Sequence, residues 1–284
     1  MNCTVLIDGS YYVFYRFHAL RVWWSKARKE DEPELPEDAP RFIETFKRTF
    51  YKKLFAILKK RKINTSRIWV AKDCPRKNIW RTQTHMTDYK AGRKPAPSGI
   101  GYFMKLAYSE LFVQPTIRGI LQHPHLEADD CVALSCNEMT KLIDITQEND
   151  NVSTEPSVCV VTSDMDYLQL ADSNVMLLTL KNTLLTDSKQ CIGNKKDNLM
   201  FKIIIGDVAD NIPGIFERCG KKTAVKLMQD PSLLSDKLAN TPGATERFNK
   251  NKTLIDFTCI PDAYKNEFLS QPETQELISL FSVD

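Results

Sequence analysis

Short apolar runs alternate with longer amphipathic stretches along the first two thirds of the chain. Five such runs occupy residues 3–8, 67–73, 116–121, 158–166 and 174–180. Runs of this length between turn-forming residues are typical of buried strands. Because stretches with helical spacing separate most of them, we predict an α/β fold with a mostly parallel central sheet flanked by helices.

Apolar residues at helical spacing predict the helices between and after these strands. In residues 40–62 the series Phe42, Phe46, Phe50, Leu54 and Leu58 indicates one long helix. Further helices are expected at residues 101–112, 127–147, 199–205 and, broken by prolines, 231–284. The polar stretches at 30–40 and 147–156 predict surface loops.

Length and composition add three limits. The 284 residues suit one large domain with an appendage, and no apolar run approaches the roughly 18 residues that a membrane span needs. The eight cysteines show neither disulfide nor zinc spacing, so we expect reduced thiols. Since a strand rather than a signal peptide starts the sequence, we expect a cytoplasmic protein, in the host cytoplasm if it is viral.

Carboxylates gather where the predicted strands end and helices begin. The nine are Asp8, Asp73, Glu127, Asp129, Asp130, Asp164, Asp166, Asp207 and Asp210. Parallel strands send their carboxyl ends to one edge of the sheet, so these groups can converge there. Ligation by oxygen alone suits Mg²⁺ or Mn²⁺, and two such ions support in-line phosphodiester cleavage. The alternative for residues 127–130 is simple capping of a helix.

Positive charge is concentrated between residues 72 and 94. The cations there are Lys72, Arg76, Lys77, Arg81, Lys90, Arg93 and Lys94, opposed only by Asp73 and Asp88. With Trp80 and Tyr89 between them, they indicate a mobile segment suited to a phosphate backbone; the alternative is a solvated basic loop. The aromatic residues between positions 11 and 24 could stack on bases, although most are expected in the core.

The segment 206–224 carries a second group of candidates. Asp207 and Asp210 are three residues apart, so one helical turn would place both on one face. Gly220 marks a turn whose backbone amides could face a phosphate, and Lys221 and Lys222 open the next helix.

Five stretches, in this order, resemble the signatures of the 5′ nucleases of the flap endonuclease superfamily. They are LIDGS at 6–10, TDYKAGRKP at 87–95, LEADD at 126–130, TSDMDYLQL at 162–170 and GDVADNIPGI at 206–215. The resemblance covers roughly residues 3–260. The stretches 72–81 and 253–262 are similar to the T4-type bacteriophage RNase H branch.

The resemblance implies a PIN-like catalytic domain at residues 1–190, with a basic arch at about 72–103. It implies a helical DNA-binding domain with a helix-3-turn-helix at 191–284. Asp8, Asp73, Glu127, Asp129 and Asp130 would surround one metal, and Asp164, Asp166, Asp207 and Asp210 a second. Lys90 and Arg93, with Arg81 nearby, would contact the scissile phosphate. The implied DNA-binding residues are Arg76, Lys77, Lys94, Gly214, Gly220, Lys221 and Lys222.

The implied activity is that of a 5′→3′ exonuclease and flap endonuclease that removes RNA primers in replication. Its cofactors would be two Mg²⁺ ions, with Mn²⁺ as a substitute. Its partners would be DNA with a 5′ flap, nicked or branched duplex and RNA·DNA hybrid, with a single-stranded-DNA-binding protein and a sliding clamp of the replisome. A monomer without membrane contact is expected. Some relatives hold K⁺ in the helix-turn-helix, but Arg218-Cys219-Gly220 replaces the Gly-x-Gly hairpin of many relatives, so K⁺ stays an alternative.

Two other classes of function are alternatives to this one. A non-catalytic protein that binds branched DNA with the same fold should have lost some of the carboxylates, and all nine are present. A PIN-type ribonuclease specific for RNA is usually smaller and lacks the GDxxDN segment. Nuclease activity on branched DNA is therefore the interpretation that uses all of these residues.

Overall fold

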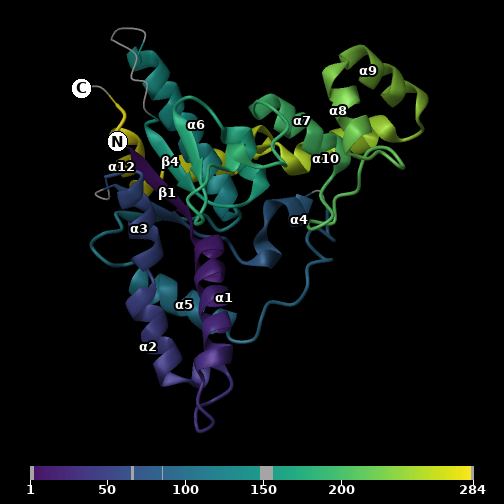
Figure 1. The fold of residues 1–284 in the computed structure, drawn as a ribbon. Helices are drawn as coiled ribbons and strands as arrows, with labels where there is room; N and C mark the ends of the chain where they lie inside the picture. Colours follow the sequence, from purple (N-terminus) through teal and green to yellow (C-terminus); the bar gives the residue numbers. More distant parts are fainter. Residues whose placement is uncertain (1–2, 65–66, 85, 148–155, 283–284) are drawn as a thin grey trace.

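Five parallel strands form the centre of the fold (Figure 1). The computed structural model describes residues 3–64, 67–84, 86–147 and 156–282. The strands are β1 (Thr4–Asp8), β2 (Ile68–Ala71), β3 (Gly119–Leu121), β4 (Val158–Val161) and β5 (Val175–Leu178). Their order is β3-β2-β1-β4-β5, and every neighbouring pair is parallel. The predicted parallel α/β sheet is confirmed.

The strand order reverses at β1. The chain moves outward from β1 through β2 to β3, and then returns to place β4 and β5 on the other side of β1. A reversal of this kind leaves a crevice outside the carboxyl ends of the two central strands. Because Asp8 pairs with Ala71 and Ile7 with Val161, the carboxylates that follow β2 and β4 reach the same edge as Asp8.

Helices cover both faces of the sheet because alternate strand residues point to opposite sides. Val5 and Ile7 pack with α1 (Gly9–Ala27), α2 (Pro40–Thr49), α3 (Lys52–Lys60) and α5 (Ile100–Leu106). Leu6 joins the opposite core, which is covered by α6 (Ala128–Gln147), α11 (Asp262–Leu269) and α12 (Pro272–Ser279). The result is a three-layer sandwich.

A third, smaller core is helical and lies beside the sheet. It is built by α7 (Lys195–Ile205), α8 (Lys221–Gln229), α9 (Pro231–Asn240) and α10 (Ala244–Ile255). The segment that contains α4 (Trp80–Thr84) contributes Ile79, Met86 and Tyr89 to it. The chain after residue 191 does not stay in this core, because α11 and α12 return to pack on α6. The predicted boundary between two domains at residues 190 and 191 stays a prediction.

Short helical turns complete the elements. The 3-10 turns are η1 (Pro36–Asp38), η2 (Arg76–Asn78), η4 (Met165–Leu170), η5 (Leu185–Asp187) and η6 (Phe257–Cys259), and η3 (Ala107–Leu111) is π-helical. The predicted loop at 30–40 is mostly exposed, and residues 148–155 of the other predicted loop lie outside the described part.

The single helix predicted for residues 40–62 is wrong, because α2 and α3 are separated at Phe50 and Tyr51. The buried hydroxyl of Tyr12 donates a hydrogen bond to the Phe50 carbonyl. The Phe50 amide in turn bonds to the Lys47 carbonyl rather than one residue further back. A polar group inserted into the backbone ladder is a known cause of such breaks, and apolar spacing does not reveal it.

None of the eight cysteines is in a disulfide, and all eight lie in the described part of the chain. Five of them are buried and three are partly exposed. Among the described residues, no helix has the length and apolar character needed to cross a membrane.

Candidate active site

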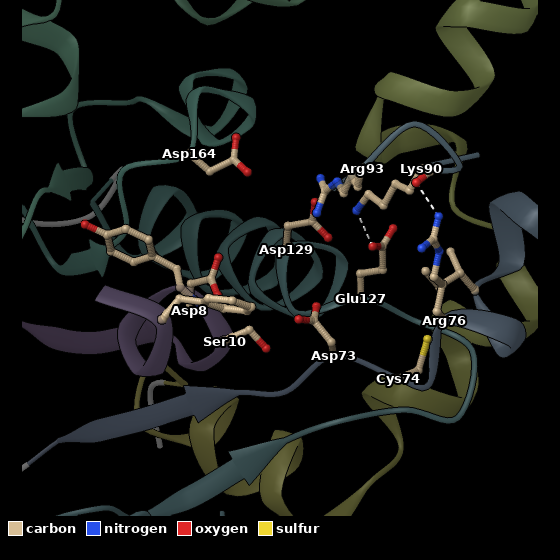
Figure 2. A pocket seen from close by; sticks show the side chains of 13 residues that line it. Asp8, Ser10, Asp73, Cys74, Arg76, Lys90, Arg93, Glu127, Asp129 and Asp164 are labelled. Atoms are coloured by element: carbon tan, nitrogen blue, oxygen red, sulfur yellow. Dashed lines mark hydrogen bonds and ion pairs between the residues drawn. The ribbon is translucent and has the colours of Figure 1, made fainter. Parts of the chain in front are cut away.

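A cavity of about 450 Å³ opens at the carboxyl edge of the sheet, where β1, β2 and β4 end (Figure 2). Five of the nine predicted carboxylates line it: Asp8, Asp73, Glu127, Asp129 and Asp164. Lys90, Arg93 and Arg76 line the side of the cavity opposite Asp8. Segments from four parts of the sequence therefore meet in one polar cavity.

Asp8 holds the junction between β1 and α1. Its carboxylate caps α1 by accepting a hydrogen bond from the Tyr11 amide (3.0 Å), and it accepts a second from the Tyr167 hydroxyl (3.1 Å). The next residue must be glycine, because a Cβ at Gly9 would lie 2.6 Å from the Ala71 carbonyl oxygen. Burial, together with the nearby charges of Asp73 and Asp164, raises the pKa of Asp8 from 3.8 to about 7.

Asp73 and Asp129 approach the cavity from β2 and from the start of α6. Asp73 accepts a hydrogen bond from the Ala128 amide (2.8 Å), which ties the two segments together. The surrounding protein desolvates the Asp73 carboxylate and raises its pKa, although the residue as a whole is exposed. Desolvation and the neighbouring Asp130 and Glu127 raise the pKa of Asp129 well above its usual value.

Glu127 and Asp210 neutralise the basic side of the cavity. Lys90 makes an ion pair with Glu127 and lies 3.7 Å from Asp210. Arg93 donates to Asp210 from Nε (3.0 Å) and from Nη2, while Tyr89 donates to both acids. Burial opposes ionisation of Glu127, but Lys90 and Arg81 lower its pKa. These cations are therefore held in place by acids, unlike the mobile charges that the sequence predicted.

Arg81 and Asp130 lie behind the cavity. Arg81 is 2% exposed and Asp130 is fully buried. The guanidinium donates to both oxygens of Asp130 (2.7 and 2.9 Å) and to the Leu254 carbonyl (2.7 Å), and the Trp80 indole donates to Asp130 (3.1 Å). The expected contact between Arg81 and a scissile phosphate does not fit this burial. Both oxygens of Asp130 already accept hydrogen bonds. The Arg81–Asp130 ion pair therefore supports the start of α6 from behind the cavity.

The remaining acids form a second cluster on the far side of Asp129. One oxygen from each of Asp166, Asp207 and Asp210 lies within 4.8 Å of the others. The two acids come together as the sequence predicted, but through a tight loop rather than an α-helical turn. The Asp210 amide bonds to the Asp207 carbonyl (3.2 Å), and an antiparallel bridge between Asp207 and Ile212 closes the loop. Asp207 faces Lys202 of α7 (2.8 Å) and Asp210 faces Arg93. Gly206 at φ +75° lets the chain turn out of α7 into this loop.

The donor set fits a hard divalent cation. Among the described residues, the side chains that face the cavity offer carboxylate oxygens and no histidine, and one thiol, that of Cys74, has its pKa raised to about 12 by burial. Raised pKa values at Asp8, Asp73 and Asp129 indicate a deficit of positive charge that a bound cation would fill. Glu127, Asp129 and Asp130 have oxygens within 4.8 Å of one another, but Arg81 and Trp80 already donate to those of Asp130, which leaves Glu127 and Asp129 as the ligands of this group. This chemistry suits Mg²⁺ or Mn²⁺ better than a soft metal.

Comparison with known proteins assigns the family. Residues 3–196 match the model of the 5′-3′ exonuclease N-terminal, resolvase-like domain. The chain belongs to the 5′-3′ exonuclease family. The match includes seven of the nine carboxylates, from Asp8 to Asp166, whereas Asp207 and Asp210 lie beyond it.

Two groups of relatives support the assignment. The 5′-3′ exonuclease of Aquifex aeolicus is 25% identical over 258 residues, which are 89% of this chain and 78% of that protein. DNA polymerase I of Caldicellulosiruptor bescii is 28% identical over 163 residues, 52% of this chain. The matched regions make up only 17% and 21% of the first two polymerase relatives.

The fold is that of the bacteriophage T5 5′-exonuclease. The T5 D15 protein crystallised with metal ions aligns with a TM-score of 0.64 over 99% of this chain and 98% of that one, at 16% identity. A T5 D15 flap endonuclease complex with DNA and metal ions aligns equally well, with a TM-score of 0.64 at 15% identity. At these identities the likeness shows the exonuclease fold and leaves the substrate to be proposed.

The predicted DNA-binding residues occupy two regions. Arg76 lines the cavity and donates to the Lys90 carbonyl, while Lys77 and Lys94 are exposed nearby. Gly220 caps α8, and Lys221 and Lys222 are exposed on its first turn. Gly214 belongs to the loop after Asp210, where an added Cβ would lie 3.0 Å from the Ile205 carbonyl oxygen.

Sequence reasoning included Tyr11 and Phe14 only among the aromatic residues that could stack on bases, and it missed the position of Lys202. Tyr11 and Phe14, one turn apart on α1, line the cavity, whereas their neighbours Tyr12 and Phe17 are core residues. Their position after Asp8 was the available signal, since residues 3 and 6 places beyond a strand end share a helix face. Lys202 gave no signal, because nothing in its sequence context tells an inward lysine from a solvated one.

We expect Asp8→Asn to stabilise the protein at pH 8 when divalent cations are removed. The folded pKa of about 7 lies above the ordinary 3.8, so the fold retains a proton that the unfolded chain loses, and stability falls as pH rises through this window. Asparagine carries no charge and can still accept the bonds from Tyr11 and Tyr167. The gain should be about 2 kcal/mol at pH 8, measured by urea unfolding in EDTA.

At pH 5 the unfolded wild-type chain has already lost this proton while the folded protein keeps it, so the gain should be smaller than at pH 8, and it should vanish below pH 3.8. Asp172→Asn is the control, because Asp172 lies outside the cavity and its pKa is lowered, burial notwithstanding, by Lys195. A loss of stability at pH 8 in Asp8→Asn, or the same gain at pH 5, would contradict the assigned pKa.

Proposed function

We propose that this protein is a divalent-metal-dependent 5′→3′ exonuclease and flap endonuclease. One observation carries the proposal: five carboxylates meet two paired cations, Lys90 and Arg93, in a single cavity at the crevice of the sheet. Acid-bound metal beside cations that can receive a phosphate is the arrangement that phosphodiester hydrolysis needs. The family assignment and the T5 fold support the same activity.

Each side chain has a proposed role. Asp8, Asp73, Glu127 and Asp129 would hold one cation, and Asp164, Asp166, Asp207 and Asp210 a second. Asp130 would act through Arg81 as a positioning group rather than as a ligand. Bound divalent cations would supply Lewis acidity that lowers the pKa of water and offsets charge on the leaving oxygen.

Lys90 and Arg93 would bind the scissile phosphate. In the structure Glu127 and Asp210 neutralise them, which holds both cations at the cavity before substrate arrives. Cations fixed in advance stabilise the growing charge of the reacting phosphate without reorganisation. Tyr11 and Phe14 provide a stacking surface for a base next to that phosphate.

The duplex would be gripped away from the cavity by the first turn of α8. Lys221 and Lys222 stand exposed there, next to backbone amides that favour phosphate oxygens. Contacts to phosphates read shape and charge rather than sequence, as suits an enzyme of branched substrates. Removal of RNA primers from RNA·DNA, in the manner of the phage RNase H branch, is the proposed biological use, with single-stranded-DNA-binding protein and clamp as partners of a monomer.

Cleavage mapping tests the substrate. We expect Mg²⁺ and the protein to release short products from the 5′ end, or the intact flap, of a DNA duplex with a labelled 5′ flap. The same duplex with a 5′ RNA segment should be cleaved as well. Cleavage of single-stranded RNA alone would favour the PIN-type ribonuclease, and tight flap binding without any product would favour the non-catalytic binder.

A further inference from the structure

Lys202 points inward from the last turn of α7 into the second acidic cluster. Its ammonium makes an ion pair with Asp166 and another with Asp207 (2.8 Å). The three side chains are only about one fifth exposed, at 19, 19 and 20%. Asp210, the third acid of the cluster, is paired instead with Arg93 and Lys90.

The effect of the ammonium is visible on Asp207. Burial alone would favour the neutral acid, but Lys202 lowers the pKa of Asp207 below its usual value. A lysine in the last turn also benefits from the negative end of the helix dipole. The second cluster therefore holds a cation of its own chain, whereas Asp8, Asp73 and Asp129 keep raised pKa values.

The space beside this ammonium is very small. A cavity of about 10 Å³ lies among Asp129, Asp166, Asp207 and Asp210, with Lys202 and Arg81 also on its walls. That is room for about one water-sized sphere. A metal ion could bind to the carboxylate oxygens of Asp166 and Asp207 only if the Lys202 ammonium moved away from them.

We propose that Lys202 is an internal counter-ion that occupies the second cation site and that a second divalent ion must displace. The inference rests on the proposed metal-dependent function and deepens it. The first ion binds beside Asp8, Asp73 and Asp129, for which no ion pair with a lysine is seen among the described residues, and the second competes with a tethered ammonium. Since the lysine stem is flexible, the displaced ammonium can turn toward a phosphate of the substrate.

Counting bound Mn²⁺ without nucleic acid tests this proposal. Free Mn²⁺ is measured by its electron paramagnetic resonance signal while the full chain is titrated at pH 8. We expect the wild type to bind one ion tightly and a second one weakly. Lys202→Met should bind the second ion about tenfold more tightly, which corresponds to about 1.4 kcal/mol. This is a modest share of the repulsion between two nearby cations.

Two variants control the result. Lys195→Met removes an exposed lysine from the same helix, paired with Asp172 outside the cluster, and should bind as the wild type does. Lys202→Arg keeps the charge and should keep the weak second site. Circular dichroism melts establish that each variant is folded before titration.

The outcomes separate the two proposals. If all proteins bind two ions equally well, or Lys202→Met binds the second ion no better than the wild type, the counter-ion inference is overturned and the metal-dependent function stands. If no protein binds Mn²⁺, both are overturned. A gain in Lys195→Met equal to that in Lys202→Met would mean that overall charge, and not the position of Lys202, sets the affinity.

Discussion

Asp129→Asn should lower the rate of 5′-flap cleavage in saturating Mg²⁺ by about 10²–10³-fold, the scale of losing one electrostatic group from a reaction centre. Asp129 faces the cavity between the two acidic clusters, and desolvation with neighbouring acids raises its pKa. Asparagine matches its volume and can still accept the hydrogen bond from the Asp130 amide (2.8 Å). The start of α6 should therefore stay intact while a ligand charge is lost.

Single-turnover kinetics on one labelled flap duplex measure this effect. Asp172→Asn, which removes a carboxylate paired with Lys195 outside the cavity, is the matched control and should cleave at the wild-type rate. Asp164→Asn should behave like Asp129→Asn, because Asp164 faces the same cavity. If Asp129→Asn keeps more than about a tenth of the wild-type rate, that rate is far above the one expected after such a loss. Asp129 would then not be a metal ligand.

Lys90→Met is expected to reduce the cleavage rate by about 10²-fold while the affinity for the flap in Ca²⁺ changes by less than about tenfold. The ammonium is held at the cavity by Glu127, and the backbone of Lys90, at φ +61°, is anchored to the Asp210 carbonyl (3.0 Å). A cation positioned in this way stabilises developing charge more than it contributes to binding. Methionine keeps the apolar stem, so the charge is the main change.

Lys94→Met is the matched control, since Lys94 is an exposed cation of the same segment. It should weaken binding slightly and leave the rate at saturation unchanged. Rate and affinity are measured at two salt concentrations. If both fall together in Lys90→Met and added salt removes the difference from wild type, Lys90 is one charge of a diffuse basic loop.

The sheet and its carboxylates were predictable because they depend on local pattern. An apolar run such as residues 158–166 that ends in acids contains both the strand and the functional group that follows it. Parallel pairing then brings Asp8, Asp73 and Asp164 to one edge regardless of the loops between them. Side-chain periodicity and strand direction were sufficient for this part of the site.

The errors arose where long-range contacts decide the outcome. Residues 40–62 divide into two helices where the Tyr12 hydroxyl, 38 residues away, contacts the Phe50 carbonyl. Arg81 was expected at the phosphate, yet its partners Asp130 and Leu254 hold it behind the cavity. No spacing in the sequence distinguishes a cation that reaches substrate from one that reaches a buried acid.

Whether metal-dependent cleavage is the function of this cavity can be decided by titrating Mg²⁺ into the wild-type protein with a labelled 5′-flap duplex. We predict no product in EDTA, a rate that rises with Mg²⁺ to saturation, and recovery of activity in Mn²⁺. Ca²⁺ should support binding without cleavage, because it occupies oxygen sites but activates water poorly. Cleavage that persists in EDTA, or its absence in both Mg²⁺ and Mn²⁺ while the flap is bound, would contradict the proposal.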